Sequence, residues 1–159
     1  GVNTNIIILE KSKLTKDGYN SMLKSDIFWK SLPYEKVLIF QSDSKLLKNG
    51  IEDFLKWDYV GAPFVFQSHG GNGGLSLRDV KLMQKICKKA NFTPYNEDVD
   101  FCNYMYENNI GKLAPREVCF EFSCEALPVL GTLGVHAIEK WLPKTACEII
   151  LNQYYFFLL

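Results

Sequence analysis

The sequence predicts one α/β domain, residues 1–159, in which helices flank a mostly parallel sheet. Three observations lead to this prediction: two short runs rich in β-branched residues, a helical pattern between them, and a further helix and strand after them. A strand, a crossing helix and a second strand place the two strands parallel in one sheet. At 159 residues, the chain is long enough to bury a sizeable core.

The second β-branched run, residues 37–40, organises the prediction. Its sequence, Val-Leu-Ile-Phe, is typical of a strand buried on both faces in the middle of a parallel sheet. The polar residues 41–44 follow it, with Asp43 near their centre. Ligands of open α/β sheets bind outside the carboxyl ends of the strands, so Asp43 is a candidate for binding a substrate or a metal ion. On position alone, a structural role in capping the next turn is the more common outcome.

Hydrophobic periodicity and turn residues define the other elements. They are a strand over residues 5–9, a helix over 14–32 broken near Ser25 and Asp26, a short helix over 51–57, a strand over 59–63, an amphipathic helix headed by Asp79, a helix from residue 97, and a strand or aromatic-rich loop over 117–125. The apolar C-terminal segment, 144–159, is expected to pack on the sheet or on a part of the protein outside this chain.

Charge and composition exclude several classes of function. The 18 basic residues balance the 18 acidic ones, which indicates neither a nucleic-acid partner nor an anionic membrane surface. No apolar run approaches the roughly 18 residues of a transmembrane helix. The five cysteines contain no Cys-x-x-Cys pair, which predicts reduced thiols in a cytoplasmic protein. The start lacks an initiator methionine and a basic region, so we expect the chain to be cut from something longer.

Residues 70–74, Gly-Gly-Asn-Gly-Gly, form the most unusual segment. Glycine at this density is expected where the backbone has positive φ or approaches a ligand closely. The bare amides of such a loop can also bind an anion such as phosphate. A flexible hairpin connection is an equally good explanation. The segment is not a Walker loop, because no Gly-Lys-Ser/Thr follows it.

Three carboxylates lie in the first turn of the helix from residue 97: Glu97, Asp98 and Asp100. The helix dipole favours anions there by about 0.3–1 kcal/mol each, which explains one or two of them without any function. A carboxylate at a helix start beside a glycine-rich loop is also well placed to act as a general base. The residues alone leave both explanations open.

One of the two histidines, His136, follows a glycine-flanked apolar stretch. A neutral imidazole in such a place can bind a metal ion. A lone histidine more often has only a structural, hydrogen-bonding role.

Several motifs occur together in a fixed order. They are Tyr19-Asn20 with Phe28-Trp29, residues 38–44 (Leu-Ile-Phe-Gln-Ser-Asp-Ser), 59–63 (Tyr-Val-Gly-Ala-Pro), 71–78 (Gly-Asn-Gly-Gly-Leu-Ser-Leu-Arg), 96–98 (Asn-Glu-Asp) and 134–136 (Gly-Val-His). In this order they resemble DUF5672, a family of glycosyltransferase-like proteins of unknown function in viruses, bacteria and eukaryotes. The resemblance extends from about residue 6 to residue 143.

The resemblance implies a GT-A-like, Rossmann-like fold and an enzyme that transfers a sugar from a nucleotide-sugar donor to a hydroxyl of a glycan or protein acceptor. It also implies a divalent cation, Mn²⁺ or Mg²⁺, held by an Asp-x-Asp motif against the donor diphosphate. Asp43 matches the last acid of that motif, whereas Gln41 stands where the first should be. His136 resembles the late histidine that completes the metal site in such families, and an N/O ligand set suits manganese.

The resemblance also implies roles for the other candidate residues. Ser44, Gly73 and Gly74 would lie against the donor, together with Gln41. Asp98 would act as the base that removes the proton of the attacking hydroxyl, and Glu97 would bind a sugar hydroxyl. Both roles assume an inverting enzyme, and neither holds if the enzyme retains configuration.

The chain departs from the GT-A pattern at its start. At most one strand, residues 5–9, precedes the first helix, so the N-terminal nucleotide-binding strands are lacking. Three explanations are open: the chain is a fragment of a larger enzyme, a partner chain supplies the missing half, or the protein has lost catalysis. A homo-oligomer is a further candidate partnership. The competing class is a non-catalytic carbohydrate-binding or assembly module that retains the fold, which the 14% aromatic content also suits. A metal-dependent hydrolase built on Asp43 is a weaker third alternative, because no second carboxylate stands at metal-ligand spacing.

Overall fold

The computed structural model describes residues 14–94 and 96–153. The elements in chain order are α1 (Lys16–Leu23), α2 (Asp26–Lys30), β1 (Lys36–Phe40), β2 (Ser44–Leu46), η1 (Ile51–Phe54), β3 (Tyr59–Pro63), β4 (Gly71–Asp79), α3 (Val80–Cys87), α4 (Glu97–Glu107), α5 (Arg116–Phe122), β5 (Ser123–Cys124), β6 (Gly134–His136), η2 (Ile138–Lys140) and α6 (Lys144–Asn152). They form a small α/β domain around two three-stranded sheets, with strand orders β1-β4-β3 and β2-β6-β5.

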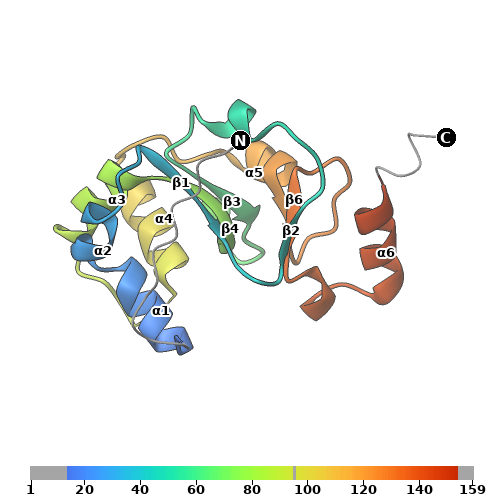
Figure 1. Cartoon of the computed structure of the whole chain (residues 1–159), viewed down its shortest axis with the longest axis horizontal. Helices are drawn as coiled ribbons and strands as arrows, with labels where there is room; N and C mark the ends of the chain where they lie inside the picture. The colour runs from blue at the N-terminus through green and yellow to red at the C-terminus, as the bar shows by residue number, and fades with distance from the viewer. Residues whose placement is uncertain (1–13, 95, 154–159) are drawn as a thin grey trace.

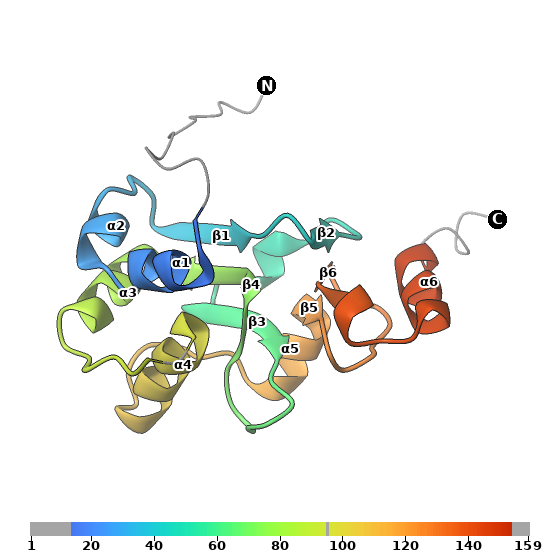
Figure 2. The same cartoon turned by 90° about the horizontal axis from the view of Figure 1, so that it is seen from below.

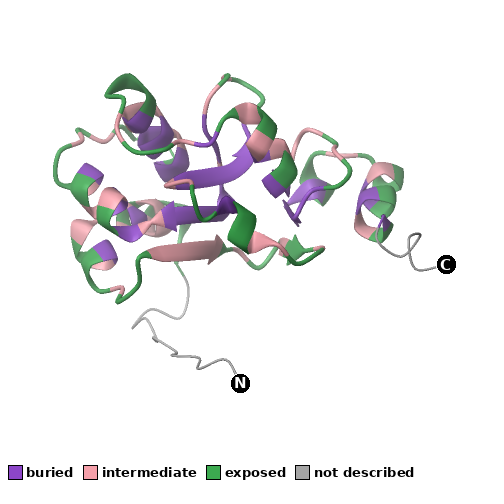
Figure 3. Cartoon of the chain, turned by 90° about the horizontal axis from the view of Figure 1, so that it is seen from above, coloured by how far each residue is buried: buried purple, intermediate pink, exposed green. Residues whose placement is uncertain are grey.

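The first sheet is the centre of three layers (Figures 1 and 2). Helices α1–α4 cover one of its faces, and the core between them contains Trp29, Tyr59 and Phe101. Helix α5 and the turn η1 cover the other face, over a core that includes Val60 and Phe122. The strands β3 and β4 are almost entirely buried between the two helical layers (Figure 3).

The prediction of a mostly parallel, GT-A-like sheet is wrong. Strand β4 pairs antiparallel with both β1 and β3, and the second sheet is mixed, because β6 runs antiparallel to β2 and parallel to β5. The apolar run in β1 is therefore not explained by a position in a parallel sheet. Val37 and Ile39 pack on the core beneath α1–α4, whereas Leu38 packs on the core beneath α5. A sheet covered on both faces needs apolar side chains on both faces, whatever the direction of strand pairing.

The N-terminal helical segment divides where the sequence predicts a break. Helix α1 begins at its cap Thr15, whose hydroxyl accepts a hydrogen bond from Gly18 N at 3.1 Å. Ser25 is the N-cap of α2. The buried Trp29 of α2 links the two helices, because its Nε1 donates a hydrogen bond to Leu23 O of α1 at 2.5 Å. The strand expected over residues 5–9 lies outside the described residues.

The predictions for the C-terminal half are less accurate. Residues 116–122 form the helix α5 instead of the expected strand or loop, and only the pair 123–124 is extended. Cys119 and Phe122, three residues apart, are the buried positions of α5, which is a helical spacing. The helix expected over residues 51–57 is only the 3₁₀ turn η1.

Helix α6 lies at the far end of the molecule from α1–α4 (Figure 1). Its Cys147 and Ile150 pack with Val135 and Ile138 in a third, small core beside the second sheet. All five cysteines of the chain are free thiols. No helix in the described part of the chain is long and apolar enough to cross a membrane.

Candidate functional site

A cavity of about 510 Å³ gathers side chains from distant parts of the chain. Its walls come from the start of α1, the turn after β1, the first half of β4, the start of α4 and the end of β6 with η2. The candidate residues that line it are Gln41, Asp43, Gly73, Gly74, Glu97, Asp98 and His136. Ser44 does not line this cavity, because its hydroxyl donates to Gly74 O at 3.1 Å.

Asp43 is the centre of one wall. Its Oδ1 lies 3.2 Å from His136 Nε2, and its Oδ2 accepts a hydrogen bond from Lys140 Nζ at 2.6 Å. The two residues meet because β2 pairs with β6 in a register that places Ser44 opposite His136. The hydrogen bond from Lys140, with the nearby charge of His136, holds the pKa of the Asp43 carboxyl below its usual value. Asp43 is therefore an ionised group that lies between the Lys140 ammonium and the His136 ring.

The donor atoms around His136 Nε2 have the spacing of neighbouring ligands of one divalent ion. Asp43 Oδ1 lies 3.2 Å and Gln41 Oε1 lies 3.1 Å from this nitrogen, and two ligands at right angles on bonds of about 2.1 Å stand about 3 Å apart. Among residues 14–94 and 96–153, no group of three or more His, Cys, Asp or Glu side chains could hold a metal ion. Magnesium is often bound by one or two carboxylates with substrate phosphates. Asp43 and His136 therefore fit an ion only if a diphosphate completes its coordination.

The other side of the His136 ring faces Glu125. Glu125 Oε1 lies 3.3 Å from Nδ1, but the geometry is not that of a hydrogen bond, and Nδ1 is buried with no hydrogen-bond partner among the described residues. His136 thus lies between two carboxylates, Glu125 on one side and Asp43 on the other.

The segment around Gly73 and Gly74 is a buried strand and not a loop. Neither residue has positive φ, so space rather than backbone conformation explains the glycines. A Cβ atom on Gly74 would overlap the His136 ring, and one on Gly73 would overlap the Arg78 guanidinium. Their amides are also taken, because Gly73 N donates to Asp98 Oδ2 at 2.8 Å and Gly74 N donates to Asn72 Oδ1 at 2.7 Å. These two amides are therefore not a bare phosphate cradle.

Substituting Gly74 by alanine is expected to lower the free energy of unfolding by about 1–3 kcal/mol, the usual cost of overpacking. The added methyl group would occupy the space of the His136 imidazole. Urea denaturation measures the effect. In a His136→Ala background the same substitution should cost less, because the ring is gone. Equal costs in the two backgrounds would contradict this explanation of the glycine.

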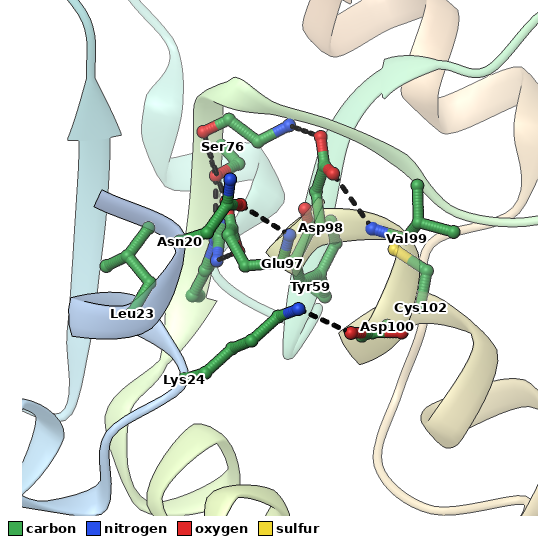
Figure 4. Close-up of polar contacts among 12 residues, drawn as sticks. Asn20, Leu23, Lys24, Tyr59, Ser76, Glu97, Asp98, Val99, Asp100 and Cys102 are labelled. Atoms are coloured by element: carbon green, nitrogen blue, oxygen red, sulfur yellow. Dashed lines mark hydrogen bonds and ion pairs between the residues drawn. The ribbon is translucent and has the colours of Figure 1, made fainter. Parts of the chain in front are cut away.

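The three carboxylates of α4 have different partners (Figure 4). Asp98 lines the cavity, and among the described residues its two oxygens accept only from the main-chain amides of Gly73 and Val99, at 2.8 and 2.9 Å. Burial raises the pKa of the Asp98 carboxyl. Asp100 does not line the cavity and binds Lys24 Nζ at 2.6 Å. Of these two acids, only Asp98 lines the cavity, and its raised pKa is typical of a base.

Glu97 lines the cavity, and its carboxylate forms an ion pair with Arg78. The guanidinium donates to both Glu97 oxygens, at 2.5 and 3.0 Å. Arg78 is completely buried and lies over the ring of Tyr59 at 4.8 Å. Burial raises the pKa of Glu97, and the Arg78 charge opposes this rise. If Glu97 binds a sugar hydroxyl as predicted, that hydroxyl would have to share the Glu97 carboxylate with the Arg78 guanidinium.

Sequence reasoning assigned no role to several residues of this site. Asn20 of α1 completes the start of α4, because its Oδ1 accepts from Glu97 N at 2.8 Å (Figure 4). Arg78 could have been found, since an arginine beside the leucines Leu75 and Leu77 in a buried strand requires a charged or polar partner. Lys140 gives no comparable signal, because a lysine in a polar segment normally faces solvent.

A family model described as "Protein of unknown function (DUF5672)" matches residues 3–136. The match includes Asp43, Asp98 and His136 and ends before Lys140. Searches of curated proteins and of solved structures find no match. The family model matches most of the length of this chain, and the chain therefore belongs to the DUF5672 family.

Proposed function

We propose that this protein transfers a sugar from a nucleotide-sugar donor to a hydroxyl of an acceptor glycan or protein. The observation that carries the proposal is that one cavity is lined both by the Asp43–His136–Lys140 cluster and by the Asp98 carboxylate. Sugar transfer needs a group that stabilises a leaving diphosphate and a group that accepts a proton, held in one site. The proposal depends on this site and not on any fold class.

The Asp43 wall is suited to a diphosphate. The Lys140 ammonium is 65% exposed, so it can turn from Asp43 to an entering phosphate oxygen. His136 Nε2 and the Gln41 amide offer further hydrogen-bond donors beside it. In the alternative with a divalent ion, Asp43 and His136 would hold the ion together with diphosphate oxygens, and His136 Nε2 would be a ligand instead of a donor. The ion would then supply Lewis-acid neutralisation of the leaving group.

Asp98 is suited to the acceptor. Its carboxylate would take the proton of the acceptor hydroxyl while the hydroxyl oxygen forms a bond to the anomeric carbon of the donor sugar. The bond from that carbon to the diphosphate oxygen breaks at the same time, and the diphosphate leaves with the electron pair. The amides of Gly73 and Val99 hold the Asp98 carboxylate in place, which favours catalysis by keeping the base oriented.

Thermal unfolding with a panel of uridine, guanosine and other nucleotide sugars, with and without Mn²⁺, tests the proposal. A donor at a hundred times its Kd should stabilise the protein by about 2.7 kcal/mol. For a chain of this size, each kcal/mol corresponds to about 2–4 °C in Tm. Asp43→Ala should abolish the shift. Asp53→Ala, which removes an exposed carboxylate outside the cavity, should retain it.

Different outcomes separate the candidate functions. A shift that Asp43→Ala abolishes, followed by release of the nucleoside diphosphate on addition of an acceptor, supports the transferase. A shift with free glycans and with no nucleotide sugar supports the carbohydrate-binding module instead. If Asp53→Ala removes the shift as fully as Asp43→Ala does, the donor does not bind at the proposed wall.

A further inference from the structure

A second cavity, of about 520 Å³, adjoins the first. Its lining among the described residues is Lys16, Phe66, Pro94, Asn96 and Val99. Lys16 and Asn96 line both cavities. Asn96 and Val99 also bracket the Glu97–Asp98 pair on the first turn of α4. A molecule in the second cavity would therefore lie against the helix turn that carries the proposed base.

The aromatic ring of Phe66 is the main exposed apolar group of this cavity. Phe66 is 64% exposed, although burying such a side chain would contribute about 1.5–3 kcal/mol. The loop that carries Phe66 is held in place, because Arg116 Nη1 donates to Phe64 O at 2.8 Å and to Gln67 O at 3.1 Å. The buried Phe64 ring also supports Phe66, with the ring centroids 4.8 Å apart. The chain therefore holds an aromatic ring in water beside the candidate site.

We infer that this second cavity binds a pyranose ring of the acceptor, and that the acceptor is a glycan. The inference rests on the proposed function and names the class and the place of its second substrate. A pyranose has faces of C–H groups, which pack on an aromatic ring, and a rim of hydroxyls, which need hydrogen-bond partners. Phe66 provides the first, and the Asn96 amide and Lys16 ammonium provide the second.

The residues that the two cavities share indicate how a bound sugar ring lies relative to the first cavity. The polar residues Lys16 and Asn96 are those that the two cavities share, whereas Phe66 and Pro94 line only the second. A sugar whose apolar face packs on Phe66 and whose hydroxyls bind Lys16 or Asn96 would therefore reach the boundary with the cavity that contains Asp98. The volume lies within the range of about 300–1,000 Å³ that is usual for small-ligand sites.

Calorimetric titration of the whole protein with hexasaccharides of glucose, N-acetylglucosamine, mannose and xylose, without a donor, tests the inference. At least one glycan should bind, and Phe66→Ala should weaken its binding about tenfold, since a tenfold change in Kd is 1.4 kcal/mol. Phe66→Tyr should keep the affinity within about threefold, because the aromatic platform is retained. Val65→Ala is the matched control, because Val65 is 59% exposed beside Phe66 but does not line the cavity.

The inference is overturned if none of the four glycans binds, or if Val65→Ala weakens binding as much as Phe66→Ala. Preferential binding of an extended peptide, with Phe66 required, would also overturn it, since the acceptor site would then be a peptide site. Asp43→Ala should leave glycan affinity unchanged. A protein that binds glycans through Phe66 but neither binds nor consumes a nucleotide sugar would keep the second cavity as a glycan site and refute the transferase.

Discussion

Replacing Arg78 by methionine is expected to lower the free energy of unfolding by about 3–5 kcal/mol, because it leaves the buried Glu97 without its counter-charge. The Arg78 guanidinium is fully buried and donates to both carboxylate oxygens. The guanidinium also lies over the rings of Tyr59 and Phe101. Urea denaturation followed by circular dichroism measures the loss, which is a large part of the stability of a typical domain.

Two further variants test whether the loss of stability comes from the buried ion pair. The double variant Arg78→Met/Glu97→Leu should recover most of the loss, because replacing both members of a buried ion pair by apolar residues is often neutral. Lys144→Met breaks the exposed pair with Glu148, whose atoms are 3.8 Å apart, and should cost less than about 1 kcal/mol. An Arg78→Met protein as stable as Lys144→Met would show that the buried pair does not hold the start of α4.

Asp98→Asn is expected to lower kcat of the proposed transferase by about 10²–10⁴-fold, because an amide cannot accept the proton of the attacking hydroxyl. The change is small in shape, and the asparagine oxygen can still accept from Gly73 N or Val99 N. Asp100→Asn is the matched control. It alters a carboxylate of the same helix that lies outside the cavity, so it should affect stability more than kcat.

The pH dependence of kcat/KM provides an independent measure of the Asp98 role. Burial raises the Asp98 pKa above its ordinary value of 3.8, and the Gly73 amide and the Arg78 charge oppose this rise. A base must be ionised to act, so the rate should fall as the pH decreases through this raised pKa. The acidic limb should therefore lie above pH 3.8 and persist in Asp98→Glu. A limb that persists unchanged in the residual activity of Asp98→Asn would assign it to another group.

Local sequence patterns were sufficient for several elements. The break between α1 and α2, the strand β3 and the helix α3 all follow from periodicity and capping residues within a few positions. Asp79 illustrates this, because its carboxylate accepts from Leu82 N at 2.8 Å and begins α3 as expected. These elements depend on neighbours in the chain, so the order of residues is enough to predict them.

The direction of strand pairing could not be predicted in the same way. A four-residue apolar run has the same appearance in a parallel sheet and in an antiparallel sheet that is covered on both faces. The strand β1 belongs to the second kind, and its pairing with β4 depends on residues far away in the chain. The prediction of a loop at the glycines Gly73 and Gly74 was wrong for a related reason. Gly73 and Gly74 leave space for the side chains of Arg78 and His136, and Gly71 lies against the main chain of Gly61 and Ala62, which no local pattern reveals.

The sequence by itself determined which chemical groups this protein possesses and which short segments are helical or extended. Only the tertiary structure decided that Lys140 binds Asp43, that Arg78 binds the Glu97 carboxylate, and that Asp98 lines the cavity without a side-chain partner among the described residues. The physical reason is that these contacts depend on β2–β6 register and on burial between layers. Both arise from packing summed over the whole chain, and a pattern of neighbouring residues does not contain that sum.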